Sequence, residues 1–286
     1  MVSTIQGLSL RRRLEEEIPP FRPVVVQLLH LAGDPTVSIG TVVNLLSTDQ
    51  SLSSDLLRLA NSPLFAAGRE IAELRYAAAY LGLDLVRSIA VTAAARGLLD
   101  LRPSPLAKAF WRHSLATSLM CRQMCGFALV PPDLAYTAGL LHDVGQIALI
   151  HLFPEYPEVI GRDVDAGASI TEAETRNFGM DHCQAGRWLL SRWRLPLVLL
   201  NVVAGHEEPP TKPVFDKALT RLVHAGSLAA DWMGLSVIAP ARPIGLPDLV
   251  AFFPESRQET LRDCLPAMMD RVLGTVNEVE MEMCVV

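Results

Sequence analysis

The sequence predicts an all-α protein, and three observations lead to this fold class. Apolar residues recur at three- and four-residue spacing along nearly the whole chain of 286 residues, which is the repeat of one face of a helix. We find no convincing run in which β-branched and polar residues alternate, as they do in a half-buried strand. Half of the residues are hydrophobic and 20% are charged, so the chain can bury a substantial core without disulfide support.

The N-terminal third is expected to form helices whose ends are set by proline, glycine and small polar residues. Pro23 can open the first helix, because a helix needs no amide hydrogen at that position, and residues 33–35 (Gly-Asp-Pro) end it. Ser51 is expected to cap the third helix, and Asn61 to close it in the left-handed conformation before Pro63. The predicted helices span residues 23–32, 38–46, 51–61, 71–81 and 84–99.

The remainder of the chain is expected to be helical as well, beyond a division at Pro103 and Pro105. A single helix that starts after Pro131 is predicted to carry the segment 139–145. Residues 169–172 (Ser-Ile-Thr-Glu) have the form of a capping box, in which the hydroxyl and the carboxylate each bind a backbone amide. The other predicted helices span residues 106–125, 181–193, 196–205, 215–233 and 259–276, with a loop around Pro240, Pro243 and Pro247 before the last.

This division defines two helical subdomains, residues 1–101 and residues 102–286. No Gly/Ser-rich segment separates them, so we expect the two to pack against each other rather than to move independently. No internal repeat and no low-complexity tract in the sequence indicates a further division.

Charge and cysteine content argue against several classes of protein. A net charge of −6 provides no excess of basic side chains to neutralise phosphates, so direct nucleic-acid binding is not expected. The apolar runs are too short to cross a bilayer, and the segment after residues 11–13 (three arginines) is acidic, unlike the core of a signal peptide. The five cysteines form no CxxC pair and are expected to be reduced thiols. We therefore expect a cytoplasmic protein without membrane contact.

The adjacent residues His142 and Asp143 are the first candidates for chemistry. A carboxylate inside an apolar helix is costly unless a partner compensates its charge. A divalent cation is one such partner, since imidazole nitrogen and carboxylate oxygen both bind it. Glycines flank His142 at three-residue spacing on both sides and leave room around its imidazole, and small residues surround His113 and His182 at helical spacing in the same way.

A plain structural role is the alternative for each of these histidines. Small neighbours also let helices approach closely around a hydrogen-bonded core histidine. His206 precedes two acidic residues at a predicted helix end and could equally cap that end. The remaining histidines lack small neighbours and are interpreted as surface or packing residues: His30, His151 and His224.

Several segments resemble the HD superfamily and, more specifically, its HDOD family. Segment 139–145 (GLLHDVG) resembles the HD signature, and segment 111–114 (WRHS) resembles the helix that carries the preceding metal-binding histidine. Segment 49–62, with an acidic turn, a leucine-rich helix and a terminal Asn-Ser, resembles the N-terminal half of HDOD domains, as does segment 77–83, which contains Leu-Gly. Further matching segments follow in the expected order at 179–182, 192–196 and 205–209, so that the resemblance covers about residues 18 to 210.

The resemblance implies an HD-like helical bundle against which the N-terminal subdomain packs. It also implies a divalent metal, which the sequence does not narrow to iron, manganese, zinc or magnesium. Three positions depart from active HD phosphohydrolases. Ser227 occupies the position of a late aspartate ligand, Gln146 occupies the position of a frequent lysine, and Gly205 occupies the position of a histidine. A neutral hydroxyl is a poor substitute for a carboxylate ligand. The implied metal ligands that remain are His113, His142, Asp143, His182 and His206.

The function implied first is therefore a non-catalytic bacterial signalling module that regulates through a protein partner. Such a partner would be a sensor kinase, a response regulator or a cyclic-nucleotide enzyme. The alternative is a metal-dependent phosphohydrolase that acts on a nucleotide or a phosphodiester. A pocket that senses a small anion or nucleotide would share features of both, and a homodimer is compatible with the sequence.

Overall fold

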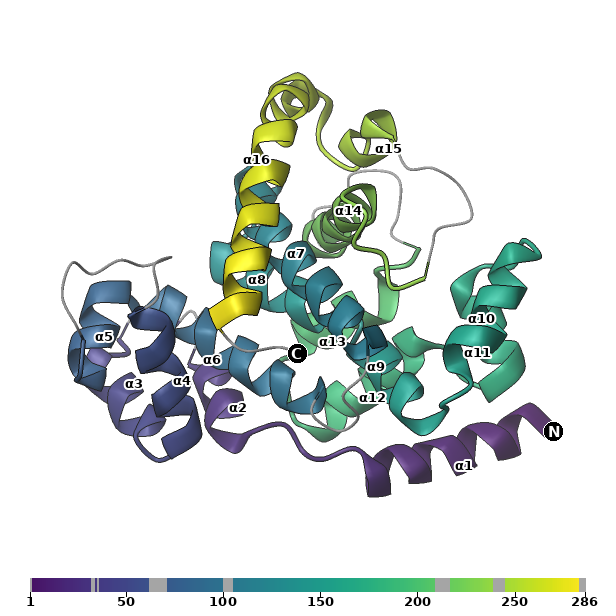
Figure 1. Ribbon diagram of the computed structural model, residues 1–286, viewed down its shortest axis with the longest axis horizontal. Coiled ribbons are helices and arrows are strands. Elements are labelled where there is room, and N and C mark those ends of the chain that lie inside the picture. Colours follow the sequence, from purple (N-terminus) through teal and green to yellow (C-terminus); the bar gives the residue numbers. More distant parts are fainter. Residues whose placement is uncertain are drawn as a thin grey trace.

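The computed structural model describes residues 2–31, 34, 36–61, 71–99, 105–208, 217–238 and 245–282. These residues form sixteen helices and no strand, so the predicted all-α class is confirmed. Figure 1 shows a smaller group of helices at one end of the molecule and a larger group that makes up the rest.

The smaller group lies where the sequence predicts helices, to within a few residues. A glycine, Gly82, separates its last two helices and has a φ of 80° and a ψ of 156°, an extended conformation with positive φ that glycine adopts without strain. The chain can therefore turn sharply there. The helices of this group are α2 (Pro23–His30), α3 (Ile39–Leu46), α4 (Gln50–Ala60), α5 (Leu74–Leu81) and α6 (Leu83–Leu99).

The start of α4 differs from the prediction. The helix begins at Gln50 rather than after Ser51, because the Asp49 carboxylate accepts a hydrogen bond from the amide of Leu52 at 3.0 Å. An N-cap side chain binds the third helical amide in this way. Asp49 and Ser51 are both good capping residues, and the first of the two caps the helix.

The end of α4 also differs from the prediction. Asn61 is not among the described residues with positive φ, so it does not close the helix in the left-handed conformation. Its side-chain amide instead donates to the Leu57 carbonyl oxygen at 2.9 Å and accepts from the Ile71 amide at 2.7 Å. Asn61 thus links the end of α4 to the chain that precedes α5. Ser62 and Pro63 lie outside the described residues.

The larger group departs from the prediction at four points. The single helix expected through residues 139–145 is broken at His142, and a further helix at 156–165 was not expected. Pro247 lies inside a short helix instead of a loop, and the last helix spans residues 255–282, so it is longer at both ends than the predicted helix at 259–276. The helices are α7 (Pro105–Ala128), α8 (Pro132–Leu141), α9 (Val144–Leu152), α10 (Tyr156–Asp165), α11 (Ile170–Phe178), α12 (His182–Arg192), α13 (Leu197–Gly205), α14 (Ala218–Trp232), α15 (Leu246–Val250) and α16 (Glu255–Glu282).

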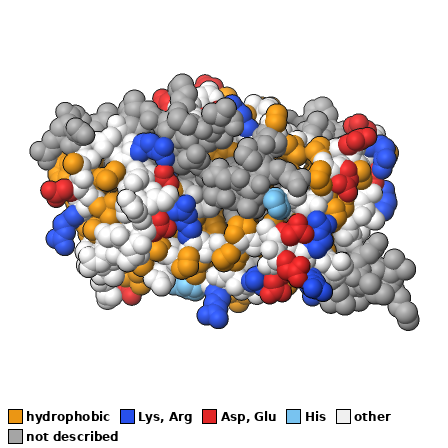
Figure 2. Space-filling view, turned by 60° about the horizontal axis from the view of Figure 1, so that its bottom comes forward, with side chains coloured by type: hydrophobic (Ala, Val, Ile, Leu, Met, Phe, Trp, Pro, Cys, Tyr) orange, Lys and Arg blue, Asp and Glu red, His pale blue; other side chains and the backbone are white. Residues whose placement is uncertain are grey.

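An N-terminal helix, α1 (Val2–Glu17), lies along the base of the larger group and contacts α9, α11 and α12. It was not expected, because its sequence is largely polar. Leu10 and Leu14, one turn apart, are buried, and Arg13 donates a hydrogen bond to the Leu152 carbonyl oxygen at 2.9 Å. In the view of Figure 2, Lys and Arg side chains of the described residues lie beside Asp and Glu.

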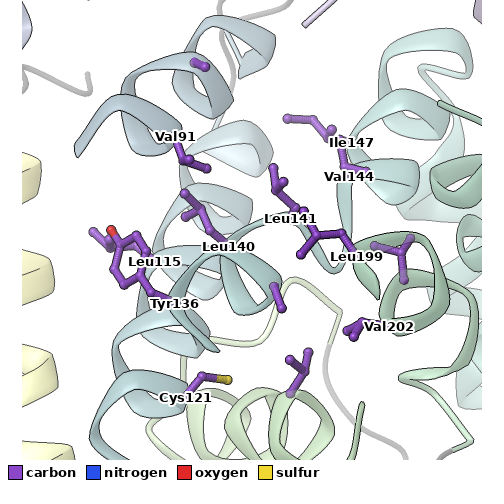
Figure 3. Close-up of a cluster of buried hydrophobic side chains, with 14 of the residues drawn as sticks. Val91, Leu115, Cys121, Tyr136, Leu140, Leu141, Val144, Ile147, Leu199 and Val202 are labelled. Carbon is purple, nitrogen blue, oxygen red and sulfur yellow. The ribbon is translucent and has the colours of Figure 1, made fainter. Parts of the chain in front are cut away.

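Helices α7, α8 and α14 pack closely at the centre of the molecule. A Cβ atom at Gly139 of α8 would lie 2.8 Å from the Cα atom of Ser118 on α7, so only glycine permits this approach. Figure 3 shows the apolar layer beside it, to which α6, α8, α9 and α13 contribute Val91, Leu140, Leu141, Val144, Ile147, Leu199 and Val202.

The N-terminal helices pack directly on this layer. Thr92 of α6 and Tyr136 of α8 share a buried hydrogen bond of 2.7 Å between their hydroxyl oxygens. The division of the chain at residue 101 remains a prediction, since residues 100–104 lie outside the described residues. No single described helix is both long and apolar enough to cross a bilayer. The segments Leu74–Leu81 and Val86–Ala95 reach that length and apolar character only when they are taken together, and the chain bends by 112° between them.

Candidate metal centre

The fold brings all five predicted ligands together in one pocket of the larger group. One comes from α7, two from the junction of α8 and α9, one from the start of α12 and one from the end of α13. Each is almost inaccessible to solvent, which is unusual for ionisable side chains unless they are paired or bind an ion. Their exposed fractions are 4% for His113, 0% for His142, 7% for Asp143, 1% for His182 and 1% for His206.

The break between α8 and α9 is what turns Asp143 into this pocket. Asp143 has φ −102° and ψ 20°, outside the helical region, and α9 starts at the next residue. Gly145 then lies against α12, where a Cβ atom would come within 1.9 Å of the His182 carbonyl oxygen. The absence of a side chain at Gly145 therefore lets His182 approach Asp143.

The Asp143 carboxylate lies between two pairs of imidazoles. Its Oδ1 is 2.9 Å from His206 Nε2 and 3.7 Å from His182 Nε2. Its Oδ2 is 3.1 Å from His142 Nε2 and 3.7 Å from His113 Nε2. Around a tetrahedral ion with bonds of 2.0–2.2 Å, neighbouring ligand atoms are about 3.3–3.6 Å apart. The observed separations bracket this spacing, so the cluster has the dimensions of a metal site.

The hydrogen bonds of the imidazoles show which ring nitrogens are free. His142 Nδ1 lies 2.8 Å from the Gly139 carbonyl oxygen, and His206 Nδ1 lies 3.0 Å from the Val203 carbonyl oxygen. A carbonyl can only accept, so each Nδ1 carries the proton. In the neutral rings, both Nε2 lone pairs then point toward Asp143. His142 Nε2 has no hydrogen-bond partner although it is buried, and a cation at this position would satisfy it.

The third imidazole, His182, is fixed by a buried acidic side chain. Glu174 is fully buried and lies 2.6 Å from His182 Nδ1 and 2.8 Å from its backbone nitrogen, both of which donate to it. The Tyr156 hydroxyl donates to the same carboxylate at 2.5 Å, and Gln146 Nε2 donates to that hydroxyl at 3.0 Å. Gln146 thus serves to position His182 through Tyr156 and Glu174.

The electrostatics of the pocket favour positive charge. Burial by itself would lower the pKa of His206, but its hydrogen bond to Asp143 and the thiol of Cys183 raise it well above the ordinary value. Burial would likewise raise the pKa of Asp143, whereas His142 and His206 hold it well below its usual range. The carboxylate is therefore charged at neutral pH and attracts a proton or a metal ion between itself and the imidazoles.

Two further acidic residues approach the histidines and were missed from the sequence. Glu207 Oε1 is 3.6 Å from His182 Nε2 and 3.5 Å from His206 Nε2. Burial would raise the pKa of Glu207, but its hydrogen bond with His182 lowers it to about 2. On α14, Asp231 Oδ1 is 3.5 Å from His113 Nδ1. Glu207 directly follows a predicted ligand, and this adjacency was the one signal that could have identified it.

The donors form overlapping groups that share Asp143. One consists of His113, His142 and Asp143, and another of Asp143, His182, His206 and Glu207, with ligand atoms in each group within 4.8 Å of one another. Ser227 occupies the position at which active HD phosphohydrolases have an aspartate, and its Oγ lies 3.4 Å from His113 Nε2. His224 is partly buried, and its Nδ1 donates to the His206 carbonyl oxygen at 2.6 Å.

This helical bundle with a His-Asp centre at a break between two helices has the architecture of the HD superfamily. The HDOD domain family matches residues 18–209, more than half of the chain. The protein belongs to the HDOD family. An uncharacterized protein of Treponema pallidum is 25% identical over 228 residues, which are 77% of this chain and 43% of the relative. The chain therefore spans less than half the length of that curated relative.

Solved structures confirm the HD-like fold. An HDOD domain protein of unknown function from Geobacter sulfurreducens is 26% identical, with a TM-score of 0.74 over 99% of this chain and 98% of the other. A protein from Shewanella amazonensis, provisionally described as a phosphohydrolase, is 21% identical, with a TM-score of 0.68 over 97% of this chain and 98% of the other. The latter likeness concerns the fold alone.

Proposed function

We propose that this chain is a non-catalytic regulatory module that holds a divalent metal in a closed pocket and acts through a protein partner. The observation that carries the proposal is the saturated donor group of Asp143, His182, His206 and Glu207. Structural metal sites use four protein ligands, whereas catalytic sites keep one position for water or substrate. Both histidines of this group are 1% exposed, which limits access further.

Two of the three positions that depart from active HD phosphohydrolases support the same function. Gln146 is 4% exposed and uses its amide to hold Tyr156, so it is not available to bind a phosphate. Ser227 brings a neutral hydroxyl, not a carboxylate, next to His113. An ion bound by the saturated donor group would neutralise Asp143 and join the three segments that carry the four donors.

The partner that fits a regulatory module of this kind is a sensor kinase, a response regulator or a cyclic-nucleotide enzyme. A cytoplasmic location belongs to the same proposal. It is supported by the described cysteines, which are free thiols, as expected in a reducing compartment.

A metal-dependent phosphohydrolase is the second candidate, and one observation favours it. The group of His113, His142 and Asp143 offers only three ligand atoms, which leaves a coordination position free, as in catalytic zinc sites. Asp231 lies next to this group, beside His113, and could stand in for the carboxylate that Ser227 does not provide. This group would then be the place of catalysis on a nucleotide or a phosphodiester.

The two functions can be separated by metal analysis of protein purified without chelator or affinity metal, combined with a phosphodiesterase and nucleotidase screen. We expect bound metal in the wild type and no hydrolysis above a metal-only control. Asp143→Ala should lower both metal content and melting temperature, because it removes the carboxylate shared by the two groups. Robust hydrolysis that vanishes in an Asp143 variant of unchanged stability would make the protein an enzyme and overturn the regulatory proposal.

A further inference from the structure

We propose that a pocket between α6, α7 and the α8–α9 junction is a binding site for a small neutral carbonyl compound. Four helices line this pocket, among whose residues are Ala95 of α6, Ser114 of α7, Leu141 of α8 and Ile147 of α9. None of the predicted metal ligands lines it. The inference therefore goes beyond the proposed function and does not depend on it.

The pocket is small and largely apolar. Its volume is about 300 Å³ with the mouth included, and about 20 Å³ of it admits the centre of a water-sized group. About 10–15 Å³ measured in this way holds one such group, so the inner part has room for the end of a ligand. The lining residues in the described part of the chain are uncharged, which disfavours an ionic ligand. Figure 3 shows Leu141 and Ile147 of this lining, which point toward the same space between α6 and α9.

Two of the lining residues carry polar atoms that lack a partner. Trp111 is 1% exposed and Ser114 is 3% exposed, and neither Trp111 Nε1 nor Ser114 Oγ has a hydrogen-bond partner within the described structure. A buried indole N–H usually has one. The two residues are three apart on α7, so their side chains share a face of the helix. A ligand in the pocket would supply the acceptor that both groups lack.

A carbonyl oxygen matches these two groups. The indole N–H can only donate and the hydroxyl can donate as well, while a carbonyl oxygen has two lone pairs and can accept from both. A buried water molecule typically makes about three hydrogen bonds. The lining side chains of the described residues offer it two polar atoms, so water would leave part of its bonding capacity unused. The apolar remainder of the pocket favours a carbonyl group attached to a hydrocarbon body.

The pocket lies directly behind the metal centre. Leu141 and Val144 line it, and between them in the chain lie the two residues at the break, His142 and Asp143, whose side chains face the metal centre. A ligand in the pocket would therefore contact the residues that flank the break on both sides. A site in this place suits an input to a regulatory module.

The test follows the indole signals of the full chain, labelled with ¹⁵N, during titration with three ketones of increasing size: acetone, cyclopentanone and cyclohexanone. The four tryptophans give four indole N–H signals, and Trp111→Phe identifies that of Trp111. A hydrogen bond to a carbonyl oxygen moves an indole proton downfield. We expect a saturable downfield shift of the Trp111 signal with at least one ketone, while the other three signals stay in place. Cyclopentane, which lacks an acceptor, should produce no such shift.

Variants of the lining separate the hydrogen bonds from the space. Ser114→Ala and Trp111→Phe should each raise the dissociation constant of the ketone about 2- to 12-fold, as the loss of one hydrogen bond predicts, with the backbone amide of Val144 as the reporter. Ala95→Leu keeps both donors but fills the pocket and should abolish binding. Trp193→Phe is the matched control, because Trp193 Nε1 is also buried without a partner in the described structure but lies outside the pocket.

Three results would each overturn the carbonyl site: no saturable shift with any of the ketones, the same shift with cyclopentane, or unchanged binding in Ala95→Leu. A wild-type melting curve and a helical far-UV spectrum would show that each variant is folded. None of these results alters the metal content of the wild type, which tests the proposed function separately.

Discussion

Replacing Gly145 by alanine should push α9 away from α12 and disturb the pocket. A Cβ atom at this position would lie 1.9 Å from the His182 carbonyl oxygen and 2.5 Å from the Gly186 amide nitrogen. Both are backbone atoms, so no side-chain rotation can relieve the overlap. Overpacking costs about 1–3 kcal/mol, and contact with backbone on both sides places this variant at the upper end. A loss of about 3 kcal/mol corresponds to a fall of about 6–12 °C in melting temperature for a chain of this size.

The assay is urea unfolding together with scanning calorimetry, and metal content is measured on the same samples. Gly161→Ala is the matched control, because a Cβ atom at Gly161 of α10 meets nothing within 4 Å. Alanine inside a helix is more stable than glycine by about 0.5–1 kcal/mol, so the control should gain stability and keep its metal. If the free energy of unfolding of Gly145→Ala fell within about 0.5 kcal/mol of the wild type, the close contact would not determine how α9 and α12 pack.

Three further predictions concern other parts of the chain. Tyr156→Phe removes a donor from the buried Glu174 carboxylate, so it should lower the free energy of unfolding in urea by about 1–3 kcal/mol and lower the metal content. Tyr136→Phe is the control and should leave the metal content unchanged. Equal metal content in both variants would refute the role of Tyr156 in positioning His182. Burial by itself would raise the pKa of Glu280, but hydrogen bonds from two basic side chains of α7 lower it overall. Its contribution to stability is therefore complete above the unfolded pKa of about 4.3 and is lost as pH falls through the lower folded pKa. The difference in unfolding free energy between the wild type and Glu280→Gln should shrink in this acidic range, and a difference independent of pH would contradict it. Thiol titration of denatured, unreduced protein should recover all five cysteines, because the described ones are free; recovery of one or three would show a disulfide.

The helices could be predicted from the sequence because they carry an apolar face with helical repeat. Helix ends were harder where two capping residues compete, as Asp49 and Ser51 do at α4. The break at His142 left no signal, since Leu141 and Val144 continue the apolar pattern across it and both are buried. α1 could not be predicted, because its few buried side chains lie in a largely polar segment. They contact other apolar side chains only when the remaining helices are in place.

The candidate ligands could be predicted individually, whereas their grouping could not. Small neighbours mark His113 and His182 as residues with space around the ring, and this is a local property of the sequence. Which carboxylate faces which imidazole depends on how α12, α13 and α14 pack, so Glu207 and Asp231 had no signal comparable to the histidines. Glu174 was missed for the same reason, since its partners become neighbours only when α11 packs against α12.

A metal bound by donors from several helices would couple the occupancy of the metal site to the stability of the fold. The donors come from α7, the α8–α9 junction, α12 and the end of α13, so an unfolded chain has no equivalent site and metal binding adds to the free energy of unfolding. An ion present at one hundred times its dissociation constant would add about 2.7 kcal/mol. Hydrogen bonds connect His182 to Glu174 of α11 and Glu174 to Tyr156 of α10. α1 packs on α11 and α12. The hydrogen-bonded contacts around His182 are therefore continuous with the packing of α1 on the larger group.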